Sequence, residues 1–141
     1  MSRMRLSWSP DLAIGVPELD QQHQELFARA AAFLDAGSSA RTDRLLDLLA
    51  QLGAYIERHF ETEARLMRQH GYPGIDARLA EHGELRHTFG RLVNRFARYG
   101  EDPRVASEVE AEIVAWLGEH ISTADRDLGA FLKRSIAPAA A

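Results

Sequence analysis

Residues 59 and 63 combine two side chains that together suggest metal chemistry. His59 and Glu63 are four residues apart, just over one helical turn, so both leave the same face of a helix. That face also carries Leu52, Ile56 and Leu66, which indicates that it points inward. An imidazole and a carboxylate are costly to bury unless they are paired, and both bind iron, zinc and manganese. The alternative is a buried His–Glu hydrogen bond, or a Glu63 that faces solvent.

Further ionisable residues fall on the inward faces of the other predicted helices. They are His23, His82, His120 and, five residues after the last of these, Asp125. A single inward histidine is commonly a satisfied core residue, but four histidines from four helices are hard to bury without a shared charge to bind. The cores of helix bundles hold metal ions with such residues, and carboxylates bridge two ions there. We therefore favour a metal site over the alternative, a purely structural polar network.

The elements that must position these side chains are helices with short connections. Apolar residues recur every three or four positions over about 18–35, 40–69, 75–99 and 104–133, and glycine-containing or proline-containing turns separate these segments. Short connections predict an all-α, up-down-up-down antiparallel four-helix bundle. Residues 1–18 have no helical period and predict an extended N-terminal arm that buries Trp8. We expect one domain over 1–134 and a flexible tail over 135–141.

Composition narrows the class of protein. The chain has 141 residues and no cysteine, so His, Asp and Glu must hold any metal. We find neither a secretory signal nor an apolar run of the ~20 residues that cross a bilayer, so we expect a cytoplasmic monomer with no membrane partner. The net charge of −4 argues against nucleic acid as a partner.

Four segments resemble the hemerythrin family, and in particular the single-domain bacterial hemerythrins. Trp8 and the segment GVPELDQQH, which ends at His23, are similar to the family's opening. HFETE, residues 59–63, resembles its H-F-x-x-E segment, and GYP, residues 71–73, resembles the turn before its third helix. WLGEHISTAD, residues 116–125, resembles the W-L-x-x-H-I-x-x-x-D segment of its last helix. The resemblance covers nearly the whole chain.

The resemblance implies two non-haem iron ions per chain, joined by an oxo or hydroxo bridge, that bind O2 or a similar diatomic ligand. His23 and His59 would hold one iron, and His82 and His120 would hold the other. Glu63 and Asp125 would bridge the two irons. The expected ligand set is therefore His23, His59, Glu63, His82, His120 and Asp125. An apolar ligand pocket would be lined by Phe60, Trp116 and Ile121.

The sequence departs from the family's pattern at residue 78. The family's third helix carries two histidines four residues apart, and here Arg78 stands in the place of the first. A guanidinium has no lone pair to offer a metal. We expect Arg78 to swing away from the metals towards water, Asp76 or Glu81. Either water then fills the vacated coordination position, or one iron is weakly held. We expect His87 to face solvent, although a helix bulge could bring it to the site.

Three functions remain open at this point. The first, which we favour, is an O2-binding protein that is not an enzyme and serves as a carrier, store or sensor. The second is a di-iron redox enzyme that reduces peroxide or nitric oxide or oxidises iron. The third is an iron-binding or signalling module whose site Arg78 has degraded.

Overall fold

The computed structural model of the chain describes residues 8–36, 41–120 and 123–136, without the side chains of residues 119, 123–125 and 136. In these residues a short 3-10 helix, η1 (Pro10–Leu12), precedes five α-helices. They are α1 (Pro17–Ala36), α2 (Thr42–His70), α3 (Ile75–Tyr99), α4 (Pro103–His120) and α5 (Thr123–Ile136). The described residues contain no strand, and the expected all-helical class is confirmed.

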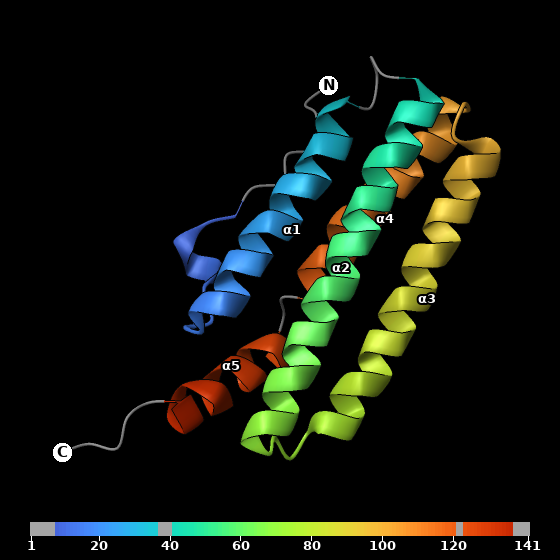
Figure 1. Cartoon of the computed structure of the whole chain (residues 1–141). Helices are drawn as coiled ribbons and strands as arrows, with labels where there is room; N and C mark the ends of the chain where they lie inside the picture. The colour runs from blue at the N-terminus through green and yellow to red at the C-terminus, as the bar shows by residue number, and fades with distance from the viewer. Residues whose placement is uncertain (1–7, 37–40, 121–122, 137–141) are drawn as a thin grey trace.

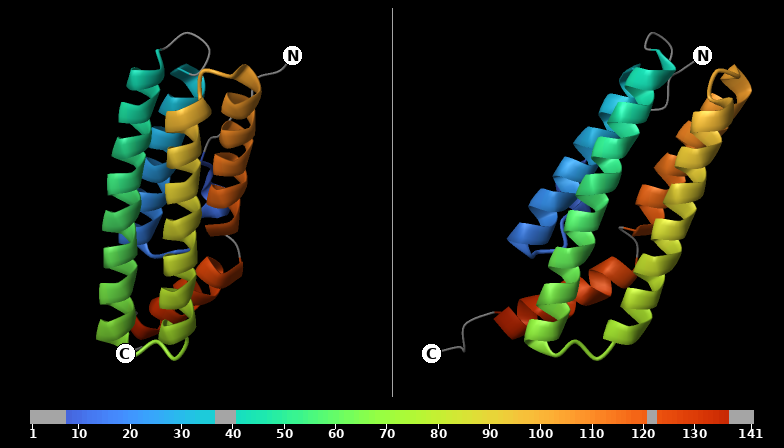
Figure 2. Two further views of the ribbon diagram at one scale, coloured as in Figure 1. Left: turned by 90° about the vertical axis from the view of Figure 1, so that its right-hand side faces the viewer. Right: turned by 45° about the vertical axis from the view of Figure 1, so that its right-hand side comes forward.

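Helices α1 to α4 lie side by side as a bundle, and α5 crosses one end of it at an angle (Figures 1 and 2). Helix α2 packs against α1, α3 and α5, while α4 packs against α3 and α1. The expected continuous helix over 104–133 is wrong, because α4 ends at His120 and α5 begins at Thr123. The expected count of four helices therefore becomes five in the described part of the chain.

Local sequence explains where the helices begin and end. Pro103 opens α4, a position at which the missing proline N–H costs nothing. Gly71 ends α2 in the left-handed conformation, with φ of 65°, and donates its N–H to the carbonyl of Met67. This is the usual glycine cap of a helix C-terminus.

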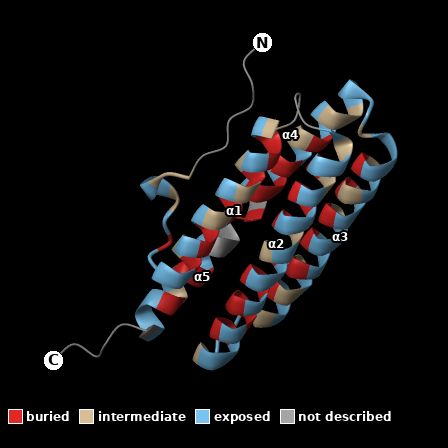
Figure 3. Ribbon diagram, turned by 45° about the horizontal axis from the view of Figure 1, so that its top comes forward, coloured by how far each residue is buried: buried red, intermediate tan, exposed pale blue. Residues whose placement is uncertain are grey.

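Figure 3 marks the buried positions along the helices. The apolar residues among them form two separate clusters. The large cluster fills the bundle between α1, α2, α3 and α4 and includes Phe33, Leu49 and Phe96. The small cluster joins the arm and α5 to the near ends of α1 and α2. Its buried members are Ile14, Val16, Leu19, Leu66, Met67, Leu128 and Leu132.

A layer of polar residues lies between the two clusters along α1 and α2, and His120 ends α4 after Leu117, the last member of the large cluster on that helix. Along α1, His23 falls between Leu19 of the small cluster and Leu26 of the large one. Along α2, Glu63 falls between Phe60 of the large cluster and Leu66 of the small one. The inward polar residues are thus enclosed by apolar side chains on both sides.

The arm is anchored by the side chain of Asp20. The backbone N–H groups of Ile14 and Gly15 donate to its two carboxylate oxygens at 2.7 and 3.1 Å. Gly15 has φ of 88°, which favours glycine at this turn. Trp8 is half-buried, where full burial was expected, and residues 1–7 of the expected arm lie outside the described residues.

The C-terminal end of the domain is helical for longer than expected. Helix α5 continues to Ile136, and the Nδ1 atom of His70 lies 3.1 Å from the Ser135 hydroxyl oxygen. Residues 137–141 of the expected tail lie outside the described residues. Within the described parts of the chain, no helix is long and apolar enough to cross a membrane.

Candidate metal centre

Three histidines from three helices meet in the polar layer. The ring nitrogens that His23 of α1, His59 of α2 and His120 of α4 direct at each other all lie within 4.8 Å of one another. All three side chains are fully buried. The Nε2 atoms of His59 and His120 are only 2.7 Å apart. Two imidazole nitrogens at this distance must share a proton or a cation, because two lone pairs repel each other.

Glu63 reaches the same group of histidines from α2, one turn after His59. Its Oε1 atom lies 3.0 Å from His59 Nε2, 3.4 Å from His82 Nε2 and 3.5 Å from His120 Nε2. Burial tends to raise the pKa of Glu63, but its interactions with the imidazoles of His59, His82 and His120 outweigh burial and hold the pKa well below 4.5. Glu63 is therefore a buried carboxylate that can accept a cation.

His120 is held in its neutral form. Burial is the largest influence and lowers its pKa well below 6.5. Glu63 opposes this shift, while the charges of His59, Arg78 and His23 add to it. A neutral imidazole keeps a lone pair for a metal, so this electrostatic environment favours ligation.

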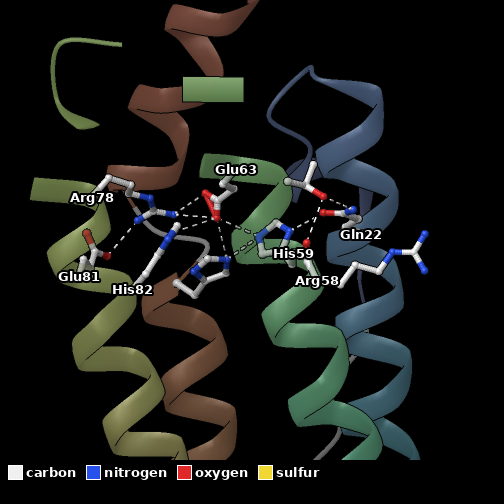
Figure 4. A network of polar contacts seen from close by, with 9 residues as sticks. Gln22, Arg58, His59, Glu63, Arg78, Glu81 and His82 are labelled. Atoms are coloured by element: carbon white, nitrogen blue, oxygen red, sulfur yellow. Dashed lines mark hydrogen bonds and ion pairs between the residues drawn. The ribbon is translucent and has the colours of Figure 1, made fainter. Parts of the chain in front are cut away.

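A chain of hydrogen bonds fixes the tautomer of His59 (Figure 4). The Thr62 hydroxyl donates to the carbonyl of Arg58 at 3.1 Å and so accepts from Gln22 Nε2 at 2.9 Å. The Gln22 carbonyl oxygen then faces His59 Nδ1 at 2.8 Å, which makes Nδ1 the donor. The lone pair of His59 is consequently on Nε2, the atom that faces His120 and Glu63.

Aromatic rings pack directly on two of the site histidines. Phe60 stacks on His82 with 4.1 Å between ring centroids and 9° between ring planes. Trp116 stacks on His120 at 6.1 Å and 17°, and its Nε1 donates to the carbonyl of Leu85 at 3.2 Å. Both aromatic residues are buried. These contacts orient the imidazoles and surround the polar cluster with apolar surface.

Arg78 enters the site rather than swinging away from it, which corrects the expectation from sequence. Its side chain is 3% exposed, and its Nη2 atom lies 3.1 Å from Glu63 Oε2. Its Nη1 atom lies 2.9 Å from Glu81 Oε1, so Glu81 is a partner of Arg78, as expected. The guanidinium of Arg78 is buried and does not extend into water. The reason is electrostatic, because a buried Glu63 carboxylate attracts the nearest cation on the facing helix.

The remaining expected site residues fall in different places. His82 lies in the layer, as above, and His87 is exposed on an uninterrupted α3. The backbone of Asp125 is in α5, but its side chain lies outside the described residues, and so does the whole of Ile121. The structure thus brings together five of the six expected ligands, His23, His59, Glu63, His82 and His120, in one buried layer.

Sequence reasoning anticipated one supporting residue, Glu81, and missed two others, Gln22 and Thr62. Gln22 and Thr62 each precede an expected ligand by one residue, and Glu81 follows Arg78 at the helical spacing of three. These spacings place Thr62 and Glu81 next to the site on their own helices, but a pairing between α1 and α2 cannot be found from spacing within one helix.

The donor set fits a transition-metal ion. Three imidazoles and a carboxylate suit iron, zinc and manganese alike. Among the described residues, the buried Nδ1 atoms of His82 and His120 have no hydrogen-bond partner, and the short contact between His59 and His120 needs a proton or a cation between its two nitrogens. A cation bound at the cluster would satisfy that contact.

Comparison with known proteins agrees with this geometry. A curated bacteriohemerythrin from Stenotrophomonas maltophilia is 28% identical over 127 residues, covering 86% of this chain and 77% of the relative. One from Clostridium acetobutylicum is 23% identical over 124 residues, covering 85% and 95%, and one from Aquifex aeolicus is 24% identical over 107 residues, covering 76% and 82%. A family model described as the Hemerythrin HHE cation binding domain matches residues 14–132, which include every expected site residue. The chain therefore belongs to the hemerythrin family, whose members bind non-haem iron.

Proposed function

We propose that this chain is a non-haem iron protein that binds O2, or a similar small diatomic ligand, inside the helix bundle. The observation that carries the proposal is the convergence of His23, His59 and His120 from three helices within 4.8 Å in a fully buried layer. The relatives of this chain are named bacteriohemerythrins. This supports iron as the metal and a diatomic gas as the ligand.

Some residues of the layer would ligate the iron, and others orient those ligands. His23, His59, His120 and Glu63 would supply the ligands, and Gln22 fixes the orientation of one of them. Ferrous iron at this position would supply the electrons for binding O2. Phe60 and Trp116 exclude water from the site, and a dry surrounding limits proton transfer to a bound gas.

Binding without turnover is the activity that these residues favour. Glu63, the described carboxylate inside the layer, is already engaged by Arg78 and the histidines. It is therefore not placed to carry protons to and from a substrate, which a redox enzyme of this class requires. We accordingly propose a binding protein, and we keep the redox enzyme as the alternative outcome of the test.

The test is anaerobic loading of the metal-free protein with Fe(II), followed by exposure to O2 and then to argon. We expect iron to co-elute with the chain and a visible absorption band to appear with O2 and to disappear under argon. The His23→Ala variant should lose the iron and the band. The His87→Ala variant, which changes an exposed residue, should keep both.

Different results would identify the other functions. Consumption of many equivalents of O2 or peroxide per iron would establish the redox enzyme instead. Absence of iron binding in the parent protein, shown to be folded by circular dichroism, would contradict the proposed function.

A further inference from the structure

The two carboxylate oxygens of Glu63 face different partners. Oε1 faces the Nε2 atoms of His59, His82 and His120 at 3.0 to 3.5 Å. Oε2 faces the Nη2 atom of Arg78 at 3.1 Å, while the same nitrogen lies at the longer distance of 3.5 Å from Oε1. Figure 4 shows Arg78 and Glu81 on one side of Glu63, and His59 and Gln22 on the other. A carboxylate that bridges two metals gives one oxygen to each, and here a permanent cation already holds one of the oxygens.

Arg78 is fixed in this position. The Glu63 carboxylate is 0% exposed and Arg78 is 3% exposed, so their ion pair is shielded from water. Glu81 holds the other end of the guanidinium from the next helical turn at 2.9 Å. Displacing Arg78 would leave a buried charge without its counter-charge, which is strongly unfavourable.

A second metal ion on the α3 side would meet the same guanidinium. Coulomb repulsion between a divalent ion and a fixed cation a few ångströms away is large where water is excluded. Arg78 also offers that ion no lone pair. The three-histidine cluster contacts Oε1 of Glu63, which the guanidinium approaches only at the longer distance of 3.5 Å.

From these contacts we infer that the chain holds one metal ion, ligated by His23, His59, His120 and Glu63 Oε1, and that Arg78 takes the place of a second ion on Glu63 Oε2. The inference rests on the proposed function, because it concerns the same metal site. It makes Arg78 the residue that determines the metal count, and it assigns this chain a mononuclear centre.

Metal stoichiometry tests the inference directly. The metal-free chain is titrated with Co(II), whose visible bands report ligation, and is separately loaded with Fe(II) and analysed by elemental mass spectrometry after desalting. We expect a break at one equivalent in the parent protein. Arg78→His, which removes the cation and adds a ligand one turn before His82, should bind two. Arg78→Lys, which keeps the cation, should bind one.

Two further variants control for position and for site. Arg91→His adds a histidine at an exposed position of the same helix, α3, and should leave the count at one. Combining Arg78→His with His82→Ala should return the count from two to one. Circular dichroism verifies that each variant is folded, and the parent and Arg78→Lys counts decide the matter if Arg78→His does not fold.

The results separate this inference from the proposed function. Two equivalents in the parent protein, or two in Arg78→Lys, would overturn the mononuclear centre and leave an iron protein in place. A single metal that survives His23→Ala would also overturn it, since the ion would then be elsewhere. No metal at all in the folded parent would overturn both.

Discussion

Both carboxylate oxygens of the buried Glu63 are engaged by neighbouring side chains. Its ionised form is stabilised by histidines on one oxygen and by Arg78 on the other, and its pKa stays well below the ordinary value in spite of full burial. The ordering of His59 depends in turn on groups that never approach the metal position. Thr62 and Gln22 transmit a fixed hydrogen-bond direction from the α2 backbone to the imidazole.

Thr62→Val tests that hydrogen-bond direction at the scale of one atom. Valine keeps the shape of threonine but removes the hydroxyl that orients the Gln22 amide, so His59 loses its preferred tautomer. We expect the affinity for Co(II) to fall by roughly 10- to 100-fold, the usual effect of removing a partner of a metal-bound histidine. A titration against a coloured competing chelator measures the change.

The matched control is Thr88→Val, which alters a half-buried threonine on α3. Its metal affinity should equal that of the parent protein. If Thr62→Val binds Co(II) as tightly as Thr88→Val does, the Gln22–His59 contact has no influence on the site.

At the scale of elements, the arm and α5 depend on a close approach between backbones. A Cβ atom on Gly129 of α5 would lie 2.7 Å from the Cβ and 3.0 Å from the carbonyl oxygen of Ile14. Glycine is therefore required where α5 passes under the arm. Gly118, in contrast, is exposed on α4, and a Cβ there would meet nothing within 4 Å.

Two glycine substitutions should consequently have opposite effects on the free energy of unfolding. Gly129→Ala forces the arm away from α5 and should cost about 1–3 kcal/mol, as overpacking commonly does. Gly118→Ala replaces a poor helix former in open space and should stabilise by about 0.5–1 kcal/mol. Urea unfolding of the metal-free protein compares them. Equal midpoints for the two variants would show that the arm does not pack on α5.

The elements that the sequence predicted well are those that local chemistry terminates. The third helix was expected over 75–99 and is Ile75–Tyr99, because glycine-containing turns flank it. The division between α4 and α5 was missed, since residues 121–127 contain neither glycine nor proline to mark the end of a helix. The orientation of Arg78 was missed because its decisive partner, Glu63, is on another helix. Spacing within α3 could identify only Glu81.

At the scale of the whole molecule, the candidate centre exists only when the bundle is complete. Helices α1, α2 and α4 supply one histidine each to the cluster, and α3 supplies Arg78. No pair of neighbouring helices contains the full set. An ion that binds this arrangement binds the folded chain and not the unfolded one, so binding and folding are thermodynamically linked.

The division of the core into two apolar clusters has a consequence for cooperativity. The small cluster holds the arm and α5, and buried polar residues separate it from the large cluster along α1 and α2. Without an ion, these polar side chains do not join the two clusters by apolar packing, so the smaller one should open as an independent unit. We expect backbone amides of α5 to exchange with deuterium well before those of α2 facing the large cluster in metal-free protein.

Loading with metal should slow the exchange of α5 amides the most, because His120 at the end of α4 is then tied to α1 and α2. Mass spectrometry of peptides from both forms measures this, and uniform slowing along the chain would contradict it. The metal would in that case stabilise a core that already unfolds as one unit.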